Sequence, residues 1–354
     1  MTDYSKKLKE LILTTIKEGA SDLHLTVGRH PTIRIAGELI PLVNEPVLTP
    51  SDTEGLIKTF LNDDEEKSLK ENKEIDLSYA HEDKTRFRVN AFYQRGFLGA
   101  ALRNIPTSIK TLKELNLPEI LTEFADRKQG FFLVVGPIGQ GKSTTLASMI
   151  DHINRTKSKH IITVEDPVEY IFTQDKSIVD QREVRYDTMS FGSAMRSMFR
   201  QDINVALIGE MRDVETISTA VTAAETGHLI FSTLHTNNAA QTIDRIIDSF
   251  PPNQQNQIRA QLASVLLGVF SQRLVSRISG GRIPAYELML NNSAVRTLIR
   301  EGRTHELDMV IETGYEQGMI SLNRSLAELV RAGEINMKDA LNQSLNPRGL
   351  EALT

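Results

Sequence analysis

A glycine-rich segment, G-P-I-G-Q-G-K-S-T, directly follows the apolar run F-F-L-V-V. It matches the pattern G-x-x-x-x-G-K-[ST], in which glycines let backbone N–H groups turn toward an anion and the next helix offers its positive end. Lys142 would reach the outer phosphates of a nucleotide, and the Ser143 hydroxyl would bind Mg²⁺. A plain glycine turn is disfavoured because the segment lies between a predicted strand and a predicted helix. The predicted phosphate-binding residues are Gly136, Pro137, Ile138, Gly139, Gln140, Gly141, Lys142, Ser143 and Thr144.

Two carboxylates follow apolar segments that are typical of buried strands. N-V-A-L-I-G-E ends at Glu210, and I-I-T-V is followed by Glu165. Open α/β sheets place their ligands at the carboxyl ends of strands, so we expect both side chains near the phosphates. Gly209 stands where such a strand often ends in aspartate, which leaves Glu210 to orient or deprotonate the attacking water. Glu165, together with Ser143 and Glu210, is expected to hold Mg²⁺ through phosphates or water.

Histidines and arginines supply further candidates. His235 follows the apolar segment H-L-I-F-S, which predicts a γ-phosphate or conformational sensor at the same sheet edge. His228 precedes that segment, and its role is more open. Arginines far away in the sequence form either a solvated basic face or a finger offered by a neighbouring subunit, which is worth about 10³–10⁵ in rate. These candidates are Arg86, Arg88, Arg95 and Arg103.

Composition restricts the class of protein. The 354 residues are 40% hydrophobic and 25% charged, which is typical of a soluble chain of two or three domains. The absence of cysteine excludes disulfides, thiolate zinc sites and cysteine nucleophiles. A net charge of −5 and 6% aromatic residues without tryptophan argue against a large nucleic-acid surface. No segment has the length of a membrane span or the pattern of a signal peptide, so we expect a cytoplasmic protein without direct membrane insertion.

The chain is expected to contain two folded parts. Residues 1–104 combine a helix at residues 7–19 with alternating strands, two of which join at Ala36 and Gly37. A proline-bounded linker follows at residues 105–118. In residues 119–354, apolar strands alternate with helical segments, which predicts an α/β fold with a parallel sheet flanked by helices. From about residue 275 to residue 354 the pattern predicts helices only.

Several long segments resemble the secretion-type ATPases, and among these the type IV pilus retraction ATPases. The resemblance implies a PAS-like N-terminal domain, a RecA-like ATPase domain and a homohexameric ring that binds ATP between the two domains. It also implies that N-terminal arginines complete the site. By motif, Glu165 falls in the aspartate box, Glu210 in the Walker B strand, and His228 and His235 in the histidine box. The segments are I-T-V-E-D-P-V-E-Y, S-M-F-R-Q-D-I-N-V-A-L-I-G-E-M-R-D, T-A-A-E-T-G-H-L-I-F-S-T-L-H-T and A-A-Q-T-I-D-R-I-I-D-S-F-P.

The same resemblance implies a motor that couples ATP hydrolysis to pilus retraction and twitching motility. Its place would be the inner face of the cytoplasmic membrane, with an inner-membrane platform protein and an accessory retraction ATPase as partners. This chain departs from the family pattern at Ile138 and Gln140 of the glycine-rich segment. It also reads R-Q-D-I-N-V at residues 200–205, where the family has R-E-D-P-D-V, and this change could alter turnover.

Other functions remain open at this point. An accessory retraction ATPase is the nearest alternative, although the run from Glu210 through Arg212 to Asp213 favours the principal type. A pilus or secretion assembly ATPase would need an extra N-terminal domain and a tetracysteine zinc site. A RecA-like nucleic-acid translocase would need a basic, aromatic-lined channel. A nucleotide-gated scaffold would bind ATP and hydrolyse it very slowly.

Overall fold

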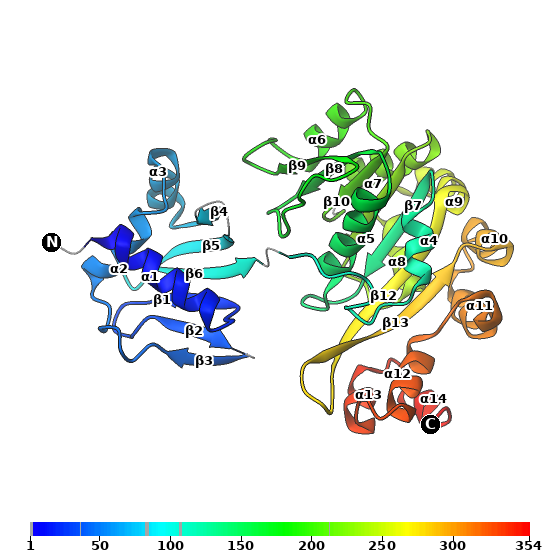
Figure 1. Cartoon of the computed structure of the whole chain (residues 1–354). Coiled ribbons are helices and arrows are strands. Elements are labelled where there is room, and N and C mark those ends of the chain that lie inside the picture. The colour runs from blue at the N-terminus through cyan, green and yellow to red at the C-terminus, as the bar shows by residue number, and fades with distance from the viewer. Residues whose placement is uncertain (1–2, 36, 82–84, 106–107, 212) are drawn as a thin grey trace. The chain divides into compact units, whose positions relative to one another are not determined.

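The computed structural model describes residues 3–35, 37–81, 85–105, 108–211 and 213–354. The chain divides into two compact units (Figure 1). Unit 1 comprises Met1–Ser108 with Pro167–Ile171, and unit 2 comprises Ile109–Asp166 with Phe172–Thr354. The domain limits 1–104 and 119–354, with their linker at 105–118, stay a prediction, and residues 106 and 107 of that linker lie outside the described residues.

Unit 1 is built on an antiparallel sheet of six strands in the order β3-β2-β1-β6-β5-β4. The predicted hairpin is present, because β2 pairs with β3 and Ile35 lies opposite Glu38. Ala36 of its turn lies outside the described residues. The strands are β1 (Asp22–Leu25), β2 (Thr32–Ile35), β3 (Glu38–Pro41), β4 (Glu74–His81), β5 (Thr85–Gln94) and β6 (Phe97–Ile105).

Three helices accompany this sheet: α1 (Tyr4–Lys17), α2 (Pro50–Lys58) and α3 (Asp63–Asn72). Leu8 and Leu11 of α1 are buried in one hydrophobic cluster with Phe87 and Val89 of β5. Because side chains alternate along a strand, Arg86 and Arg88 project from the opposite face of β5. The alternation predicted from the sequence is therefore confirmed, and it leaves a polar face on this sheet.

Unit 2 contains a sheet of seven strands in the order β13-β12-β7-β11-β10-β8-β9. Every neighbouring pair is parallel except β12 and β13, which are antiparallel. The predicted α/β fold with a parallel sheet is confirmed. The strands are β7 (Gly130–Val135), β8 (His160–Glu165), β9 (Ile178–Glu183), β10 (Val205–Ile208), β11 (Leu229–Leu234), β12 (Leu266–Ser276) and β13 (Arg282–Leu290).

Helices cover both faces of this sheet (Figure 1). On one face, Phe124 of α4 stacks on Phe132 of β7 with ring centroids 4.4 Å apart. On the other face, Leu133 of β7 shares a core with buried residues of later helices, such as Met195 and Ile311. In the part of the chain that the structure describes, no helix has both the length and the apolar character needed to cross a membrane. The helices are α4 (Ile120–Ala125), α5 (Lys142–Thr156), α6 (Phe191–Met198), α7 (Val214–Glu225), α8 (Ala239–Asp248), α9 (Pro252–Val265) and α10 (Ser293–Glu301).

The C-terminal region is not all-helical, so the prediction for residues 275–354 is wrong in its first part. Strand β12 continues to Ser276, and β13 occupies Arg282–Leu290. Pro284 spoils the strand pattern in the sequence, but β13 is an edge strand, where a proline is tolerated if its nitrogen faces away from the neighbouring strand. After α10 the described elements are helical: η1 (Thr304–Glu306), α11 (Leu307–Thr313), η2 (Tyr315–Gln317), α12 (Leu322–Arg331), α13 (Met337–Gln343) and α14 (Pro347–Glu351).

Candidate active site

Strand register brings the predicted residues to one edge of the unit 2 sheet. Val135 at the end of β7 lies opposite Leu234 at the end of β11. Ile208 at the end of β10 lies opposite Ser232 of β11 and Val164 of β8. Since these strands are parallel, the segments that follow them leave the sheet at the same edge. The glycine-rich segment, Glu210 and His235 belong to these segments, and Glu165 is the last residue of β8.

The glycine-rich loop has the backbone of an anion-binding turn. Gly136, Gly139 and Gly141 have φ of 143°, 76° and 80°, values that favour glycine and that turn successive N–H groups inward. Gly141 is the N-cap of α5 and has no side chain with which to cap it. The first N–H groups of α5 therefore remain available to a phosphate, and the helix dipole favours its negative charge. The loop fits the β-phosphate of a nucleotide.

The Lys142 side chain lies inside this loop, and the residue is 7% exposed. It donates to the carbonyl oxygens of Gly136 and Pro137 at 2.8 and 2.9 Å. His235 also lies close, with its Nδ1 3.2 Å from Lys142 Nζ. Phosphate oxygens carry more charge than carbonyl oxygens, so the same ammonium would favour them as acceptors.

Glu210 lies on the other side of His235. Its Oε2 lies 3.8 Å from His235 Nε2, and its side chain is 16% exposed. Thr233 of β11 donates its hydroxyl to the Gly209 carbonyl at 2.6 Å and so fixes the chain just before Glu210. His235 consequently lies between Lys142 and Glu210, which is the position expected of a side chain that senses the γ-phosphate.

Gly209 is required by the close approach of two strand ends. A Cβ at this position would lie 3.2 Å from Val164 O and 3.4 Å from Glu165 Cα. Glu165 is buried and accepts a hydrogen bond from Thr163 Oγ1 at 2.7 Å. Its neighbour across the ladder is Glu183 of β9, a second buried carboxylate that the sequence analysis missed. The small residue therefore lets Glu165 lie directly beside the chain that carries Glu210.

These oxygen donors fit Mg²⁺ only in combination with phosphates. Ser143, Glu165 and Glu210 offer a hydroxyl and carboxylates, which suit a hard cation that is bound by one or two carboxylates together with substrate phosphates. Among the described residues, no group of three or more His, Asp or Glu side chains could hold a metal ion alone. The remaining ligands would have to be phosphate oxygens and water.

His228 does not lie with this group. It precedes β11, whereas His235 follows that strand, and the two ends are about 20 Å apart at the rise of a β-strand. Its Nδ1 lies 3.0 Å from Ala223 O, and its ring contacts Phe199 edge to face. A catalytic role for His228 stays a prediction, because the site within this chain does not include it.

Three of the predicted arginines lie on the polar face of unit 1. Arg88 of β5 and Arg103 of β6 are directly opposite, so their side chains share a face. Asp22 of β1 is the next residue in the row, and its carboxylate accepts from Arg103 Nε at 3.0 Å. Arg34 lies 3.8 Å from the same carboxylate, and Arg86 is two residues from Arg88 on the same face. Several positive charges therefore share this face with the carboxylate of Asp22, and a second carboxylate, Asp76 of β4, lies on the same face opposite Asn90.

Arg95 lies elsewhere in unit 1. It forms, with Gly96, the two-residue turn between β5 and β6, and both residues have positive φ. The turn is about 20 Å from Arg88 along the strand. Arg95 and the pair Arg88–Arg103 cannot therefore serve the same phosphate.

The altered segment at residues 200–205 lies at the amino end of β10, away from Glu210. The Asn204 side chain accepts from the His160 N–H at 2.9 Å and joins the starts of β10 and β8. Any influence of residues 200–205 on turnover would have to be transmitted along β10 and β8. Arg212, which the sequence analysis used to favour a principal retraction ATPase, lies outside the described residues.

The sequence analysis missed a polar layer on β12 and β13 beneath the loops of the site. Gln272 contacts the glycine-rich loop, and Arg273 donates to both oxygens of Asn237, two residues after His235. Glu287 of β13 accepts from the Ala239 N–H at 2.8 Å at the start of α8. No motif marks these residues, and only their polarity inside apolar strands could have revealed them.

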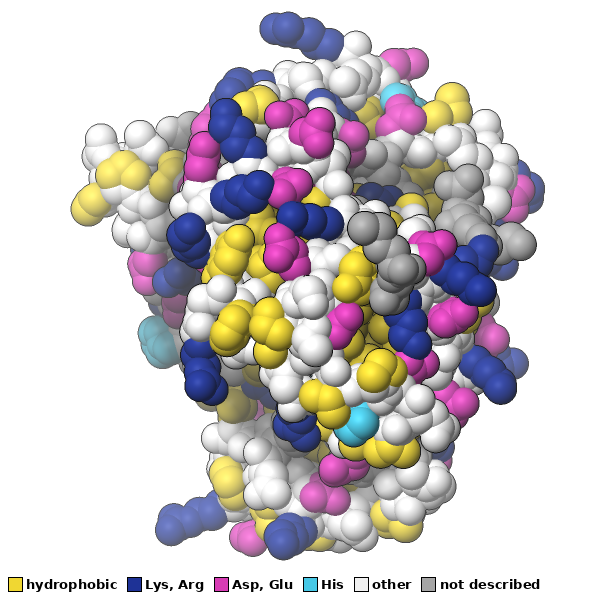
Figure 2. Space-filling view, turned by 90° about the vertical axis from the view of Figure 1, so that its left-hand side faces the viewer, with side chains coloured by type: hydrophobic (Ala, Val, Ile, Leu, Met, Phe, Trp, Pro, Cys, Tyr) yellow, Lys and Arg dark blue, Asp and Glu magenta, His cyan; other side chains and the backbone are white. Residues whose placement is uncertain are grey.

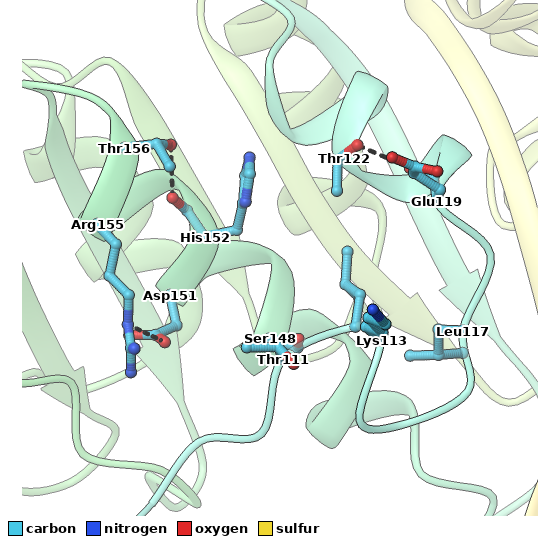
Figure 3. A pocket seen from close by; sticks show the side chains of 11 residues that line it. Thr111, Lys113, Leu117, Glu119, Thr122, Ser148, Asp151, His152, Arg155 and Thr156 are labelled. Atoms are coloured by element: carbon cyan, nitrogen blue, oxygen red, sulfur yellow. Dashed lines mark hydrogen bonds and ion pairs between the residues drawn. The ribbon is translucent and has the colours of Figure 1, made fainter.

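A cavity of about 540 Å³ lies beside α5 rather than at the glycine-rich loop. Figure 3 shows its side chains on two facing elements, the segment before and within α4 and the middle of α5. Burial raises the pKa of Asp151 there, while the nearby Arg155, 2.7 Å away, opposes this shift. None of the predicted site residues lines this cavity. Its labelled residues are Thr111, Lys113, Leu117, Glu119, Thr122, Ser148, Asp151, His152, Arg155 and Thr156.

Comparison with known proteins covers nearly the whole chain. The family model described as type II/IV secretion system protein matches residues 3–342. The type IV pilus retraction ATPase PilT of Pseudomonas aeruginosa is 44% identical over 340 residues, which is 96% of this chain and 98% of that protein. The type IV pilus ATPase PilU of the same organism is 41% identical over 336 residues, 95% of this chain and 88% of that protein.

A solved structure agrees with these sequence matches. The crystal structure of the pilus retraction motor PilT with bound ADP is 48% identical to this chain. It superposes with a TM-score of 0.91, covering 97% of this chain and 98% of that one. The similarity therefore extends over both units.

The buried carboxyl of Glu287 makes stability depend on pH. Burial raises its pKa to about 7; the bond from Ala239 N–H and the charge of Arg273 oppose this shift, and Asp308 adds to it. The folded chain thus binds this proton more tightly than the unfolded chain, so stability falls as pH rises through about 5 to 7. We expect Glu287→Gln to unfold with a higher free energy than the wild type at pH 8, by up to roughly 3 kcal/mol.

Chemical denaturation at pH 5 and pH 8 measures this difference. The gain of Glu287→Gln should shrink at pH 5, where the wild-type carboxyl is protonated. Glu312→Gln, on the exposed side of α11, is the matched control and should follow the wild type at both values. Parallel pH profiles for the wild type and Glu287→Gln would show that Glu287 does not carry the effect.

Proposed function

Since the chain belongs to the type II/IV secretion system protein family, we propose that it is a motor ATPase that couples ATP hydrolysis to retraction of a type IV pilus. The carrying observation is the convergence of Lys142, His235 and Glu210 at the start of α5. It occurs in a chain that resembles a pilus retraction motor with bound ADP along 97% of its length. The similarity to pilus retraction proteins supports the role in pilus retraction, and the geometry of the site supports ATP hydrolysis.

Different residues along the glycine-rich loop would bind different parts of the nucleotide. Backbone N–H groups of residues 138–144 would surround the inner phosphates, and Lys142 would exchange its carbonyl acceptors for oxygens of the β- and γ-phosphates. Ser143 would bind Mg²⁺ through its hydroxyl oxygen, and the charge of the ion would offset that of the phosphates. Glu165, at the end of β8, would help to hold the ion.

Hydrolysis would depend on Glu210. A carboxylate can orient the attacking water and accept its proton. Glu210 follows the end of β10 and lies close to His235, the side chain next to Lys142. His235, within reach of both side chains, would report the loss of the γ-phosphate to the segment before α8. We propose that movement of this segment before α8 is the first conformational change that follows hydrolysis.

The arginines of unit 1 would complete the site. Arg88 and Arg103 share one face, and a guanidinium that meets the γ-phosphate stabilises the charge of the transition state. Phosphoryl transfer would then require unit 1 of the same chain or of a neighbour to close on the loop. We propose a homohexameric ring, in which each hydrolysis depends on how neighbouring chains are arranged.

The proposed place of action is the cytoplasmic side of the inner membrane, where the motor would contact the platform protein of the pilus machine. An accessory retraction ATPase is the second candidate, favoured by the 41% identity with PilU. Retraction force in a host that lacks the gene would separate the two, because loss of a principal motor abolishes retraction at full load. An accessory motor would leave retraction intact without load.

The nucleic-acid alternative has less support. Figure 2 shows basic and acidic side chains interspersed on one face, without a continuous basic stripe among the described residues drawn there. A translocase of single strands needs a positively charged groove with stacking aromatic side chains. Single-stranded DNA should therefore leave the ATPase rate unchanged.

The carboxylate assignment is tested by Glu210→Gln. The amide keeps the size of the side chain but accepts a proton poorly, so we expect the ATPase kcat to fall about 10²- to 10⁴-fold. The dissociation constant for Mg-ATP should change by less than about threefold, because the loop is untouched. Glu123→Gln, exposed on α4, is the control and should keep both values. An unchanged kcat in Glu210→Gln would place the base elsewhere.

The arginine assignment is tested by Arg88→Ala and Arg103→Ala. We expect each to lower kcat about 10³-fold or more while the affinity for Mg-ATP falls much less, since the guanidinium acts on the transition state. Arg29→Ala, on an exposed loop of unit 1, is the control. Wild-type rates in both variants, with a loss in Arg95→Ala, would move the finger to the β5–β6 turn.

A further inference from the structure

Strand β12 extends beyond the end of its parallel neighbour. Its pairing with β7 ends where Ser271 lies opposite Val135, but β12 itself runs on to Ser276. Past this point, the glycine-rich loop takes the place of a strand along the edge of β12. A strand edge carries N–H and C=O groups that need partners. The N–H and C=O groups at this end of β12 therefore need partners in the glycine-rich loop.

Gln272 uses both ends of its side-chain amide on the loop. Its Oε1 accepts from Thr145 Oγ1 at 2.6 Å, and its Nε2 donates to the Gln140 carbonyl at 2.7 Å. Gln272 is 3% exposed, so its amide is buried, and the bond to Thr145 is shielded from water. One bond reaches the loop, and the other reaches the first turn of α5. Gln272 thus joins the two parts of the chain that would hold the phosphates.

The backbone of β12 fits the loop equally closely. A Cβ at Gly136 would lie 2.4 Å from the Gln272 carbonyl oxygen, so only glycine allows this approach. The Leu274 N–H donates to Gln140 Oε1 at 2.6 Å. Gln140, a departure from the family pattern, therefore satisfies a donor on the strand edge that β7 does not reach. The departure has a structural role in this chain.

The opposite face of β12 contacts the segment after His235. Ser271 Oγ donates to Asn237 O at 3.0 Å, and Arg273 donates to the same oxygen at 3.2 Å. Because successive side chains of a strand point to opposite faces, three adjacent residues reach two different loops. β12 therefore fixes the glycine-rich loop and the His235 segment relative to each other.

We propose that Gln272 is a positioning residue of the phosphate-binding loop, with Gln140 as its partner in this chain. N–H groups bind an anion well only if they are held in place before the anion arrives, within about 0.5 Å of the productive geometry. Two bonds from one rigid strand provide that restraint. This inference rests on the proposed function, because it assumes that the loop binds a nucleotide.

A merely structural role would give a different result. Any buried hydrogen-bonded amide stabilises the fold, so loss of stability alone says nothing about positioning. Asn291 offers the matched comparison: it is 7% exposed, and its Nδ2 donates to Ala263 O at 3.0 Å and Leu266 O at 2.6 Å. Leu266 is the first residue of β12, at the far end from the loop.

The experiment measures the dissociation constant for Mg-ADP and the midpoint of thermal unfolding without nucleotide, on the full chain. Gln272→Met keeps the volume and removes both bonds, and we expect Mg-ADP to bind about tenfold more weakly. Asn291→Leu should lower the unfolding midpoint to a similar extent and leave the dissociation constant within about twofold. Gln140→Ala removes only the acceptor for Leu274 N–H and should weaken binding by roughly threefold.

Equal affinity of Gln272→Met and the wild type would overturn the inference, as would an equal loss of affinity in Asn291→Leu. If Gln272→Met fails to fold, Gln140→Ala decides, and wild-type affinity in that variant would overturn the inference. A wild-type chain that binds no Mg-ADP would remove the proposed function and this inference together. That result differs from a wild type that binds while every variant binds equally well.

Discussion

The Lys142 ammonium is held by the carbonyl oxygens of its own loop, and the rest of the site is arranged around this contact. Gly136 O and Pro137 O lie within 2.9 Å of it, and His235 lies at 3.2 Å. A buried cation needs acceptors on every side, so the loop must fold closely around it. We propose that the same arrangement becomes a phosphate site when phosphate oxygens replace the two carbonyl oxygens as acceptors for Lys142. Binding and release of a nucleotide would then exchange one set of acceptors for the other.

The second constraint is the register of the parallel sheet. Glu165, Glu210 and His235 lie at or just after the ends of three strands that are separate in sequence, and parallel pairing brings these ends to one edge. Gly209 lets two of these ends approach, and side chains of β12 hold the glycine-rich loop and the segment after His235. The arginines that we propose to compensate the charge of the phosphates lie on the sheet face of a different unit. Under this proposal, hydrolysis would depend on how the units come together.

Much of this arrangement is predictable from the sequence, because local signals carry it. The glycine-rich loop, the strand ends at Glu165 and Glu210, and the alternation at Phe87 all depend on spacing that a single sequence displays. Strand β12 was missed because α9 passes into it without a turn, and a continuous apolar run does not distinguish strand from helix. Gln272 was missed because its partners are more than a hundred residues away.

A structure of the full chain with Mg²⁺ and a non-hydrolysable ATP analogue tests the central claim most directly. The account predicts that Lys142 Nζ leaves Gly136 O and Pro137 O for oxygens of the β- and γ-phosphates. It also predicts that Glu210 faces the γ-phosphate and that Gln272 keeps both of its bonds. An analogue bound away from residues 136–144, with Lys142 still on its two carbonyls, would contradict the account.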